Sequence, residues 1–182
     1  QAHSSLENNY LKDGFWAMSL KEELANPGMD ATIIKEIRDI TDMMLGDLSV
    51  EASEQERRAH LKAKSAELIE KTKEETGYDA YIKAFYHGNQ YLLFVNEVFT
   101  DIRIVGAPPS SIGKYGFDTD NWVWPRHTGD FSVFRIYANA DNKPADYSEE
   151  NKPYQPKHFL PVNIQGVEEN DFTLVYGFPG RT

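Results

Sequence analysis

The stretch DAYIKAFYHGNQYLLFVNEVF, residues 79–99, decides the fold class of this chain. Aromatic and β-branched residues are frequent in both of its halves, which is typical of strands that pack in a sheet. Gly88-Asn89 stands between the halves, and this dipeptide suits a tight hairpin turn with positive φ. The stretch therefore predicts two antiparallel strands, at about 79–87 and 90–99.

The segments on either side of this hairpin extend the β pattern. Residues 29–40 are rich in β-branched side chains and predict a strand before the hairpin. Apolar runs predict further strands at about 100–105, 131–138, 159–164 and 171–178, whereas the polar segment 139–158 predicts an exposed connection. Many short strands joined by turns favour an antiparallel barrel or sandwich, so the predicted fold class is mainly β.

One long helix, residues 53–76, is expected between the first of these strands and the hairpin. Ser53 and Glu56 have the spacing of a capping box, and Gly77 supplies the C-terminal stop. The buried stripe of this helix is expected to consist of Leu61, Ser65, Leu68 and Thr72. Two i,i+4 ion pairs are expected on its solvated face, Glu54 with Arg58 and Glu67 with Lys71.

Composition excludes several classes of partner and chemistry. The chain has 182 residues, 40% of them hydrophobic, which is enough for one domain with a sizeable core. Its formal net charge of -10 argues against nucleic acid and anionic lipid as partners. No apolar run approaches the ~20 residues of a membrane span. With no cysteine, the chain has no disulfide, no thiol nucleophile and no cysteine-ligated zinc.

The ends of the chain suggest a piece of a longer protein. The chain begins with Gln1 and not with methionine, so we expect that an upstream segment has been removed. Residues 172–180 predict a buried strand running into a turn, and the sequence ends two residues later. We therefore expect a fragment at both ends.

Residues 118–132 hold two tryptophans, a histidine, an arginine and three aspartates, and so form the segment most suited to chemistry. A metal site at His127 and Asp130 is one interpretation, but a single histidine with scattered carboxylates matches the usual spacings poorly. A phosphate loop at 106–114 is rejected because the glycine spacing is wrong and Tyr115 stands where Ser or Thr is needed. In a purely structural interpretation, Trp122 and Trp124 cover the core and Asp130 caps a turn.

The remaining interpretation of this segment is catalytic. Asp130 follows Gly129 at the entrance of a strongly apolar strand, where we expect its carboxylate to be partly buried. Such a carboxylate suits the orienting member of a serine-protease triad, which accepts the Nδ1–H of a histidine and stabilises the imidazolium as it forms. A side chain of Asp130 that points into bulk water, far from the first residues of the chain and from Asn121 and Trp122, would contradict this interpretation.

Three motifs resemble a known family. Residues 106–132 contain Asp-Asn-Trp-Val-Trp-Pro-Arg-His-Thr-Gly-Asp, and residues 10–17 and 177–182 read Tyr-Leu-Lys-Asp-Gly-Phe-Trp-Ala and Gly-Phe-Pro-Gly-Arg-Thr. All three resemble the bacterial serine dipeptidyl-peptidases of types seven and eleven, and the similarity extends along essentially the whole chain. The resemblance implies a chymotrypsin-like double β-barrel. Residues 1–182 would then be a single domain, an incomplete first barrel with one long inserted helix.

The resemblance also assigns roles to three residues. It implies that Asp130 is the triad aspartate, and that Asn121 and Trp122 help to hold the free amino terminus of an oligopeptide substrate. An ammonium group needs oxygen acceptors, which an asparagine carbonyl supplies, and an adjacent tryptophan adds apolar contact and cation–π attraction. The resemblance implies no cofactor and no metal, a periplasmic or cell-surface location, and a parent protein that forms a homodimer.

The other two members of the triad are not expected in this chain. The family's catalytic histidine belongs to an Asn-His-His motif before the position of Gln1, and its serine to a later Gly-Asn-Ser-Gly-Ser-like turn. No such motif surrounds any histidine of the chain, namely His3, His60, His87, His127 and His158, or its candidate serines Ser110, Ser111 and Ser132. The fragment is therefore expected to be inactive alone. Specificity at the second substrate residue stays open. The alternative is a non-enzymatic β-domain that binds peptide or sugar through Trp122 and Trp124.

Overall fold

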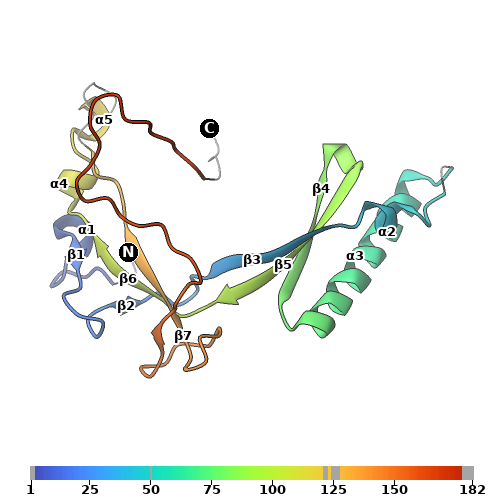
Figure 1. The fold of residues 1–182 in the computed structure, drawn as a ribbon, viewed down its shortest axis with the longest axis horizontal. Coiled ribbons are helices and arrows are strands. Elements are labelled where there is room, and N and C mark those ends of the chain that lie inside the picture. The colour runs from blue at the N-terminus through green and yellow to red at the C-terminus, as the bar shows by residue number, and fades with distance from the viewer. Residues whose placement is uncertain (1–2, 50, 121–122, 124–127, 178–182) are drawn as a thin grey trace.

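Two antiparallel sheets make up the structure, a computed structural model that describes residues 3–49, 51–120, 123 and 128–177 (Figure 1). A three-stranded sheet has the order β3 (Ala31–Asp39), β5 (Gln90–Phe99), β4 (Asp79–Phe85). In the second sheet, β6 (Ile102–Ala107) pairs with β1 (Phe15–Trp16) and β2 (Leu24–Ala25) and with β7 (Val133–Ala138), which pairs with β8 (Lys152–Pro153). Because β5 leads directly into β6, the junction at Thr100 and Asp101 connects the sheets.

The three-stranded sheet packs one face against the long helix α3 (Glu54–Thr76) and the short helix α2 (Thr41–Leu45). Ile40, Met44, Leu68, Ala80, Tyr91 and Leu93 form this core. A smaller core lies where the two sheets join, with Phe99, Ile102 and Ala138 at its centre. The observed elements confirm a mainly β fold with one long helix; the expectation of a single domain over residues 1–182 stays a prediction.

The long helix confirms the sequence prediction in its ends and in two of the four residues of its expected stripe, whereas Leu61 and Ser65 are only half-buried. Ser53 and Glu56 form the capping box, and Gly77 ends the helix in a left-handed conformation with φ 69°. Leu68 and Thr72 are its buried residues. Of the two expected ion pairs, Glu54–Arg58 is present at 3.0 Å. The other is wrong, because Glu67 pairs with Lys64 and Lys71 pairs with Glu75, which are also neighbours on the helix surface.

The hairpin strands are confirmed, but the turn between them is wider than predicted. The first strand ends at Phe85, and Tyr86–Gly88 form one turn of 3₁₀-helix. Positive φ angles occur at Tyr86, His87 and Gly88, whereas Asn89 has φ −89°. The predicted two-residue turn at Gly88-Asn89 is therefore wrong. The side-chain amide of Asn89 donates to the Tyr86 carbonyl at 2.7 Å, which closes the longer turn.

The C-terminal third differs most from the sequence prediction. Residues 159–164 and 171–177, all within the described part of the chain, form no strand, and residue 178 lies outside it. Their apolar side chains are exposed, with Phe159 at 80% and Val175 at 99%. The segment 139–158, predicted as an exposed connection, instead contains β8 and packs the ring of Tyr154 on Phe99, with the ring centroids 4.7 Å apart.

Three short helices and the observed ends of two predicted strands complete the fold. The chain has a short helix α1 (Tyr10–Asp13) before β1, and α4 (Ser110–Gly113) and α5 (Phe117–Asp120) between β6 and β7. The strand predicted at 100–105 begins at Ile102 and ends at Ala107, and the one predicted at 131–138 begins at Val133. In the described part of the chain, no helix is both long and apolar enough to cross a membrane.

Candidate functional site

The segment between β6 and β7, residues 108–132, carries the predicted site residues, and the N-terminal segment packs against its start. Trp16 on β1 lies so close to Gly106 that a β-carbon at position 106 would come within 2.2 Å of its Cε3 atom. Gly14, with φ 76°, lies against Pro109, and a β-carbon there would lie 2.7 Å from the Pro109 nitrogen. Both close approaches require glycine, so residues 14–16 hold the exit of β6 in place.

Two residues separate Asp130 from the start of β7, and a backbone contact with α4 precedes it. The amide of Gly129 donates to the Ile112 carbonyl at 3.1 Å, and the Ser110 hydroxyl donates to the Lys12 carbonyl at 3.3 Å. The side chain of Asp130 is exposed, so the expected partial burial is wrong. Asp130 precedes the residues of β7 that pair with β6, and no described element covers its side chain. Its role in a triad stays a prediction.

The other predicted site residues divide into those that the structure describes and those that it does not. Asn121, Trp122, Trp124 and His127 lie outside the described residues. His60 on α3 contacts the Met44 carbonyl at 3.2 Å, and His87 lies in the hairpin turn. Both therefore lie with the three-stranded sheet and its helices, and not in the segment that carries Asp130. Ser110 is bound to the backbone of α1, and Ser111 and Ser132 are exposed.

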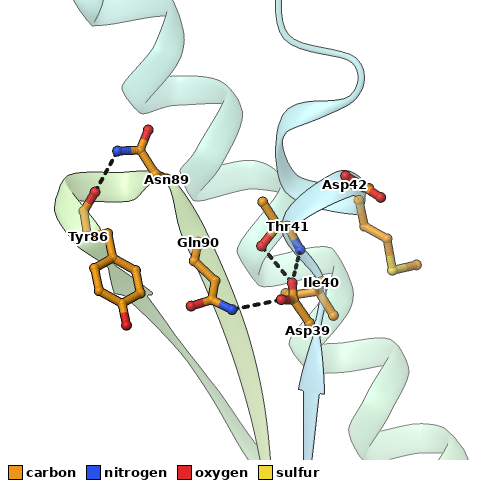
Figure 2. Close-up of a pocket in the computed structure, with 8 residues that line it drawn as sticks. Asp39, Ile40, Thr41, Asp42, Tyr86, Asn89 and Gln90 are labelled. Carbon is orange, nitrogen blue, oxygen red and sulfur yellow. Dashed lines mark hydrogen bonds between the residues drawn. The ribbon is translucent and has the colours of Figure 1, made fainter.

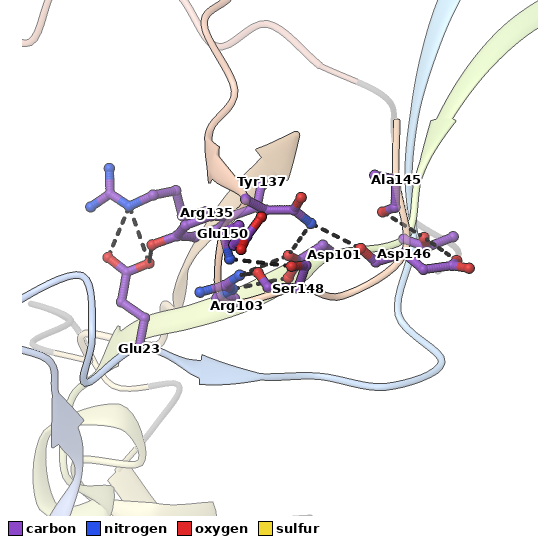
Figure 3. Close-up of polar contacts among 11 residues, drawn as sticks. Glu23, Asp101, Arg103, Arg135, Tyr137, Ala145, Asp146, Ser148 and Glu150 are labelled. Atoms are coloured by element: carbon purple, nitrogen blue, oxygen red, sulfur yellow. Dashed lines mark hydrogen bonds and ion pairs between the residues drawn. The ribbon is translucent and has the colours of Figure 1, made fainter. Parts of the chain in front are cut away.

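A polar network across β6 and β7 was not anticipated from the sequence (Figure 3). Arg103 and Arg135 are direct partners across the two strands, and each has its own carboxylate. Arg103 donates to both oxygens of Asp101, at 2.9 and 2.8 Å. Arg135 donates through Nε to Glu23 at 2.8 Å, and the Tyr137 hydroxyl donates to the same carboxylate at 2.9 Å. Opposed like charges destabilise a strand pair, so the two acids compensate the two arginines.

The sequence contains only part of the signal for this network. Asp101, directly before β6, and Arg103 alternate with Ile102 and Ile104. Arg135 and Tyr137 flank Ile136 on β7, so each pair is expected on one face. That alternation could have indicated a polar face. The participation of Glu23, separated from Arg135 by 112 positions, has no local sequence signal.

Burial and hydrogen bonding set the pKa values of these groups. Burial alone would raise the pKa of Asp101, but hydrogen bonds from Arg103 and Asn151 outweigh it and hold the pKa below its ordinary value. The hydrogen bond with Asp101 raises the pKa of Arg103. Burial, followed by the hydrogen bond to Glu23, raises the pKa of Tyr137 to about 12. Asp101 and Arg103 therefore carry full charges near neutral pH, and Tyr137 stays a neutral donor.

The same network binds the segment after β7 to the junction between the sheets. The amide of Asn151 donates to Asp101 at 2.9 Å, and Arg103 donates to the Ser148 carbonyl at 2.8 Å. The Thr100 hydroxyl donates to the Ala145 carbonyl at 3.2 Å. An open pocket of about 460 Å³ lies beside the network, lined in part by Glu23, Arg103 and Tyr137.

A second open pocket, of about 600 Å³, lies at the far end of the three-stranded sheet (Figure 2). Asp39 accepts hydrogen bonds there from Thr41 and Gln90, which lower the pKa of its carboxyl. This pocket belongs to the sheet that does not carry Asp130. Among the residues that the structure describes, no group of three or more His, Cys, Asp or Glu side chains could hold a metal ion.

Comparison with known proteins identifies the family. The family model for peptidase S46 matches residues 1–182. The chain is 54% identical to an Asp/Glu-specific dipeptidyl-peptidase of Capnocytophaga gingivalis and 46% identical to dipeptidyl-peptidase 7 of Porphyromonas gingivalis, in each case over 100% of this chain and 26% of the relative. It therefore spans about a quarter of the length of these curated relatives.

A solved structure supports the same assignment. The crystal structure of Porphyromonas endodontalis DPP11 in complex with the dipeptide Arg-Asp matches with a TM-score of 0.78 and 50% identity, over 91% of this chain and 25% of that chain. This match is in accord with the mainly β fold and its one long helix. Together, the family match and the relatives confirm the resemblance to bacterial dipeptidyl-peptidases of types seven and eleven. The chain belongs to the peptidase S46 family.

Proposed function

We propose that this chain is part of a serine-type dipeptidyl-peptidase that removes dipeptides from the free N-terminus of oligopeptides. The observation that carries the proposal is 50% identity to a DPP11 that was crystallised with dipeptides, across almost the whole chain. Both groups of similar relatives are named dipeptidyl-peptidases. No observation favours the alternative of a non-enzymatic β-domain that binds peptide or sugar.

In this proposal the chain supplies the triad carboxylate and the subsite for the substrate's amino terminus. Asp130 accepts the Nδ1–H of a histidine and stabilises the imidazolium that forms when the serine is deprotonated. The histidine and serine come from elsewhere in the protein, as part of a chymotrypsin-like pair of barrels, and the chain by itself is inactive. Asn121 and Trp122 bind the substrate ammonium, which sets a distance of two residues between the amino terminus and the cleaved bond.

We further propose a preference for Asp or Glu at the second substrate residue. Relatives named Asp/Glu-specific are 48–54% identical to the chain, whereas those named dipeptidyl-peptidase 7 are 43–46% identical.

A periplasmic or cell-surface location and a homodimer are the remaining parts of the proposal. Cell fractionation and analytical ultracentrifugation of the full-length protein test them, and a cytoplasmic monomer would contradict both.

The test uses the full-length protein and fluorogenic dipeptidyl substrates. We expect cleavage of substrates with Asp or Glu at the second position, weaker cleavage of matched substrates with Leu there, and none when the amino terminus is acetylated. Asp130→Asn should lower kcat by about 10⁴-fold, because the wrong histidine tautomer is then favoured. The exposed Asp120→Asn, in the same segment, is the control and should retain activity. Unchanged activity in Asp130→Asn would remove this residue from the triad.

A further inference from the structure

Strand β7, which follows Asp130, has few backbone pairings in the half nearest to that residue. Phe131 and Ser132 separate Asp130 from β7, and the pairing of β7 with β6 is irregular at this end, between Ile104 and Gly106. In the described chain, β8 pairs with β7 only at Tyr137 and Ala138, at the opposite end. The half of β7 nearest Asp130 therefore has a single neighbouring strand and a broken register.

Glu23 reaches this strand from the far side of β6. Glu23 immediately precedes β2, which pairs with β6 along the edge opposite β7, with Leu24 facing Ile104. Its carboxylate accepts hydrogen bonds from Arg135 and Tyr137 of β7 (Figure 3). The side chain of Glu23 is only 2% exposed, so its charge is screened little by solvent. One carboxylate thus joins β2 to β7 across the intervening strand.

The charge of Glu23 matters because two arginines face each other in this pair of strands. Arg103 is balanced by Asp101, and Glu23 provides the carboxylate for Arg135. Without that negative charge, Arg135 would lie opposite Arg103 with no carboxylate beside it, and repulsion would push β7 away from β6. Asp130, at the start of the segment that leads into β7, would move with it.

We propose that Glu23 is a positioning residue, which holds β7 against β6 and thereby places the Asp130 carboxylate for its histidine. The inference rests on the proposed dipeptidyl-peptidase function. Glu23 touches no substrate in this account and acts only through β7. Because a misplacement of about 1 Å can cost about 100-fold in rate, a modest shift of β7 is enough to reduce turnover.

The test compares Glu23→Gln with Glu97→Gln in the full-length protein. Glu97 is a matched control: its side chain is 3% exposed and pairs with Lys35 at 3.0 Å and with Lys143 at 3.6 Å, but it lies on β5 and pairs with neither arginine of β6 and β7. We expect Glu23→Gln to lower kcat about tenfold with KM nearly unchanged, at a temperature where both variants are folded. Glu97→Gln should retain the wild-type kcat. Hydrogen exchange should become faster for the amides of residues 129–135 in Glu23→Gln only.

Each outcome decides the inference. A normal kcat in Glu23→Gln, an effect confined to KM, or an equal loss in both variants would overturn the positioning role while leaving the dipeptidyl-peptidase activity intact. If the wild-type protein cleaves no dipeptidyl substrate, the proposed function fails instead. Hydrogen exchange then decides the structural part, because unchanged protection of residues 129–135 in Glu23→Gln would show that Glu23 does not hold this segment.

Discussion

Asp101 and Glu36 form the same kind of ion pair in two different environments. Each carboxylate accepts two hydrogen bonds from an arginine two residues later on its own strand, Arg103 or Arg38. The side chains are 0% and 8% exposed in the first pair and 49% and 36% in the second. The buried pair therefore loses solvation that the exposed pair keeps, and its two charges depend on each other.

This difference predicts unequal costs of removing the carboxylate charge. Asp101→Asn should destabilise the protein by about 3–5 kcal/mol, because Arg103 would stay buried without a counter-charge. Glu36→Gln, the matched exposed change, should cost less than about 1 kcal/mol. Urea denaturation of both variants measures the free energies of unfolding. Similar losses in the two variants would contradict the argument.

The same carboxylate predicts a dependence of stability on pH. The folded-state pKa of Asp101 lies below the ordinary value of 3.8, so its contribution is fully present above that pH and is lost as the pH falls through the folded value. The stability difference between wild type and Asp101→Asn should therefore be constant from neutral pH to about pH 5 and shrink below about pH 4. A difference that persists unchanged to pH 3 would show that the pairing is not ionic.

At the residue scale, the sequence indicated which residue types form a candidate site, but not how buried their side chains are or which residues they contact. Asp130 stands out in the sequence because of its motif, but its exposure depends on elements far away in the chain and could not be inferred locally. Glu23 gave no sign of its role, because its partners are more than a hundred positions distant. Burial of a charge is a tertiary property, and a single sequence shows it only where strand alternation places several charges on one face.

At the scale of elements, the pairing of β1 with β6 depends on one glycine. A β-carbon at position 106 would lie 2.2 Å from Cε3 of Trp16, inside the ring's van der Waals surface. Gly106→Ala should therefore displace Trp16 and destabilise the protein by about 1–3 kcal/mol. In a Trp16→Ala background the same change should cost less than about 1 kcal/mol, because the overlap is gone. Denaturation of the four proteins gives the coupling, and additive losses would exclude a steric cause.

Elements with local signals were predicted well, and the strand predicted at 29–40 is confirmed as β3 although its partner β5 is distant in the sequence. The helix 53–76 carries its own cap and stop, so both of its ends could be predicted from the sequence. The strands of the hairpin were also predicted, because they are neighbours in sequence and in the sheet. The runs 159–164 and 171–177 have equally apolar side chains, but a strand exists only when another strand pairs with it, and the described chain offers none.

At the scale of the whole molecule, residues 139–151 connect the two sheets. Lys143 lies 3.6 Å from Glu97 on β5, and Asn151 binds Asp101 at the start of β6. Thr100, at the junction itself, binds the Ala145 carbonyl. The segment therefore contacts both sides of the junction and restricts rotation of one sheet against the other.

Loosening this segment should expose it to proteolysis. Asn151→Ala removes the hydrogen bonds to Asp101 and to the Asp146 carbonyl, which should raise the rate of chymotryptic cleavage after Tyr147 about tenfold. Asn163→Ala, which removes a hydrogen bond to Gly166 in an exposed segment, is the control and should leave that rate unchanged. Mass spectrometry of timed digests measures the cleavage. Equal rates in wild type and Asn151→Ala would show that other contacts hold the segment.

The opposed arginines of β6 and β7 also have a consequence for folding. A slip of one residue between these strands would turn Arg135 and Tyr137 toward the opposite face, away from Glu23. Glu23 would then be buried without its cation, whereas Asp101 would keep Arg103, so the misaligned pairing would cost the free energy of one unpaired buried carboxylate. The buried charge of Glu23 therefore favours the observed register of the two strands over the shifted one during folding.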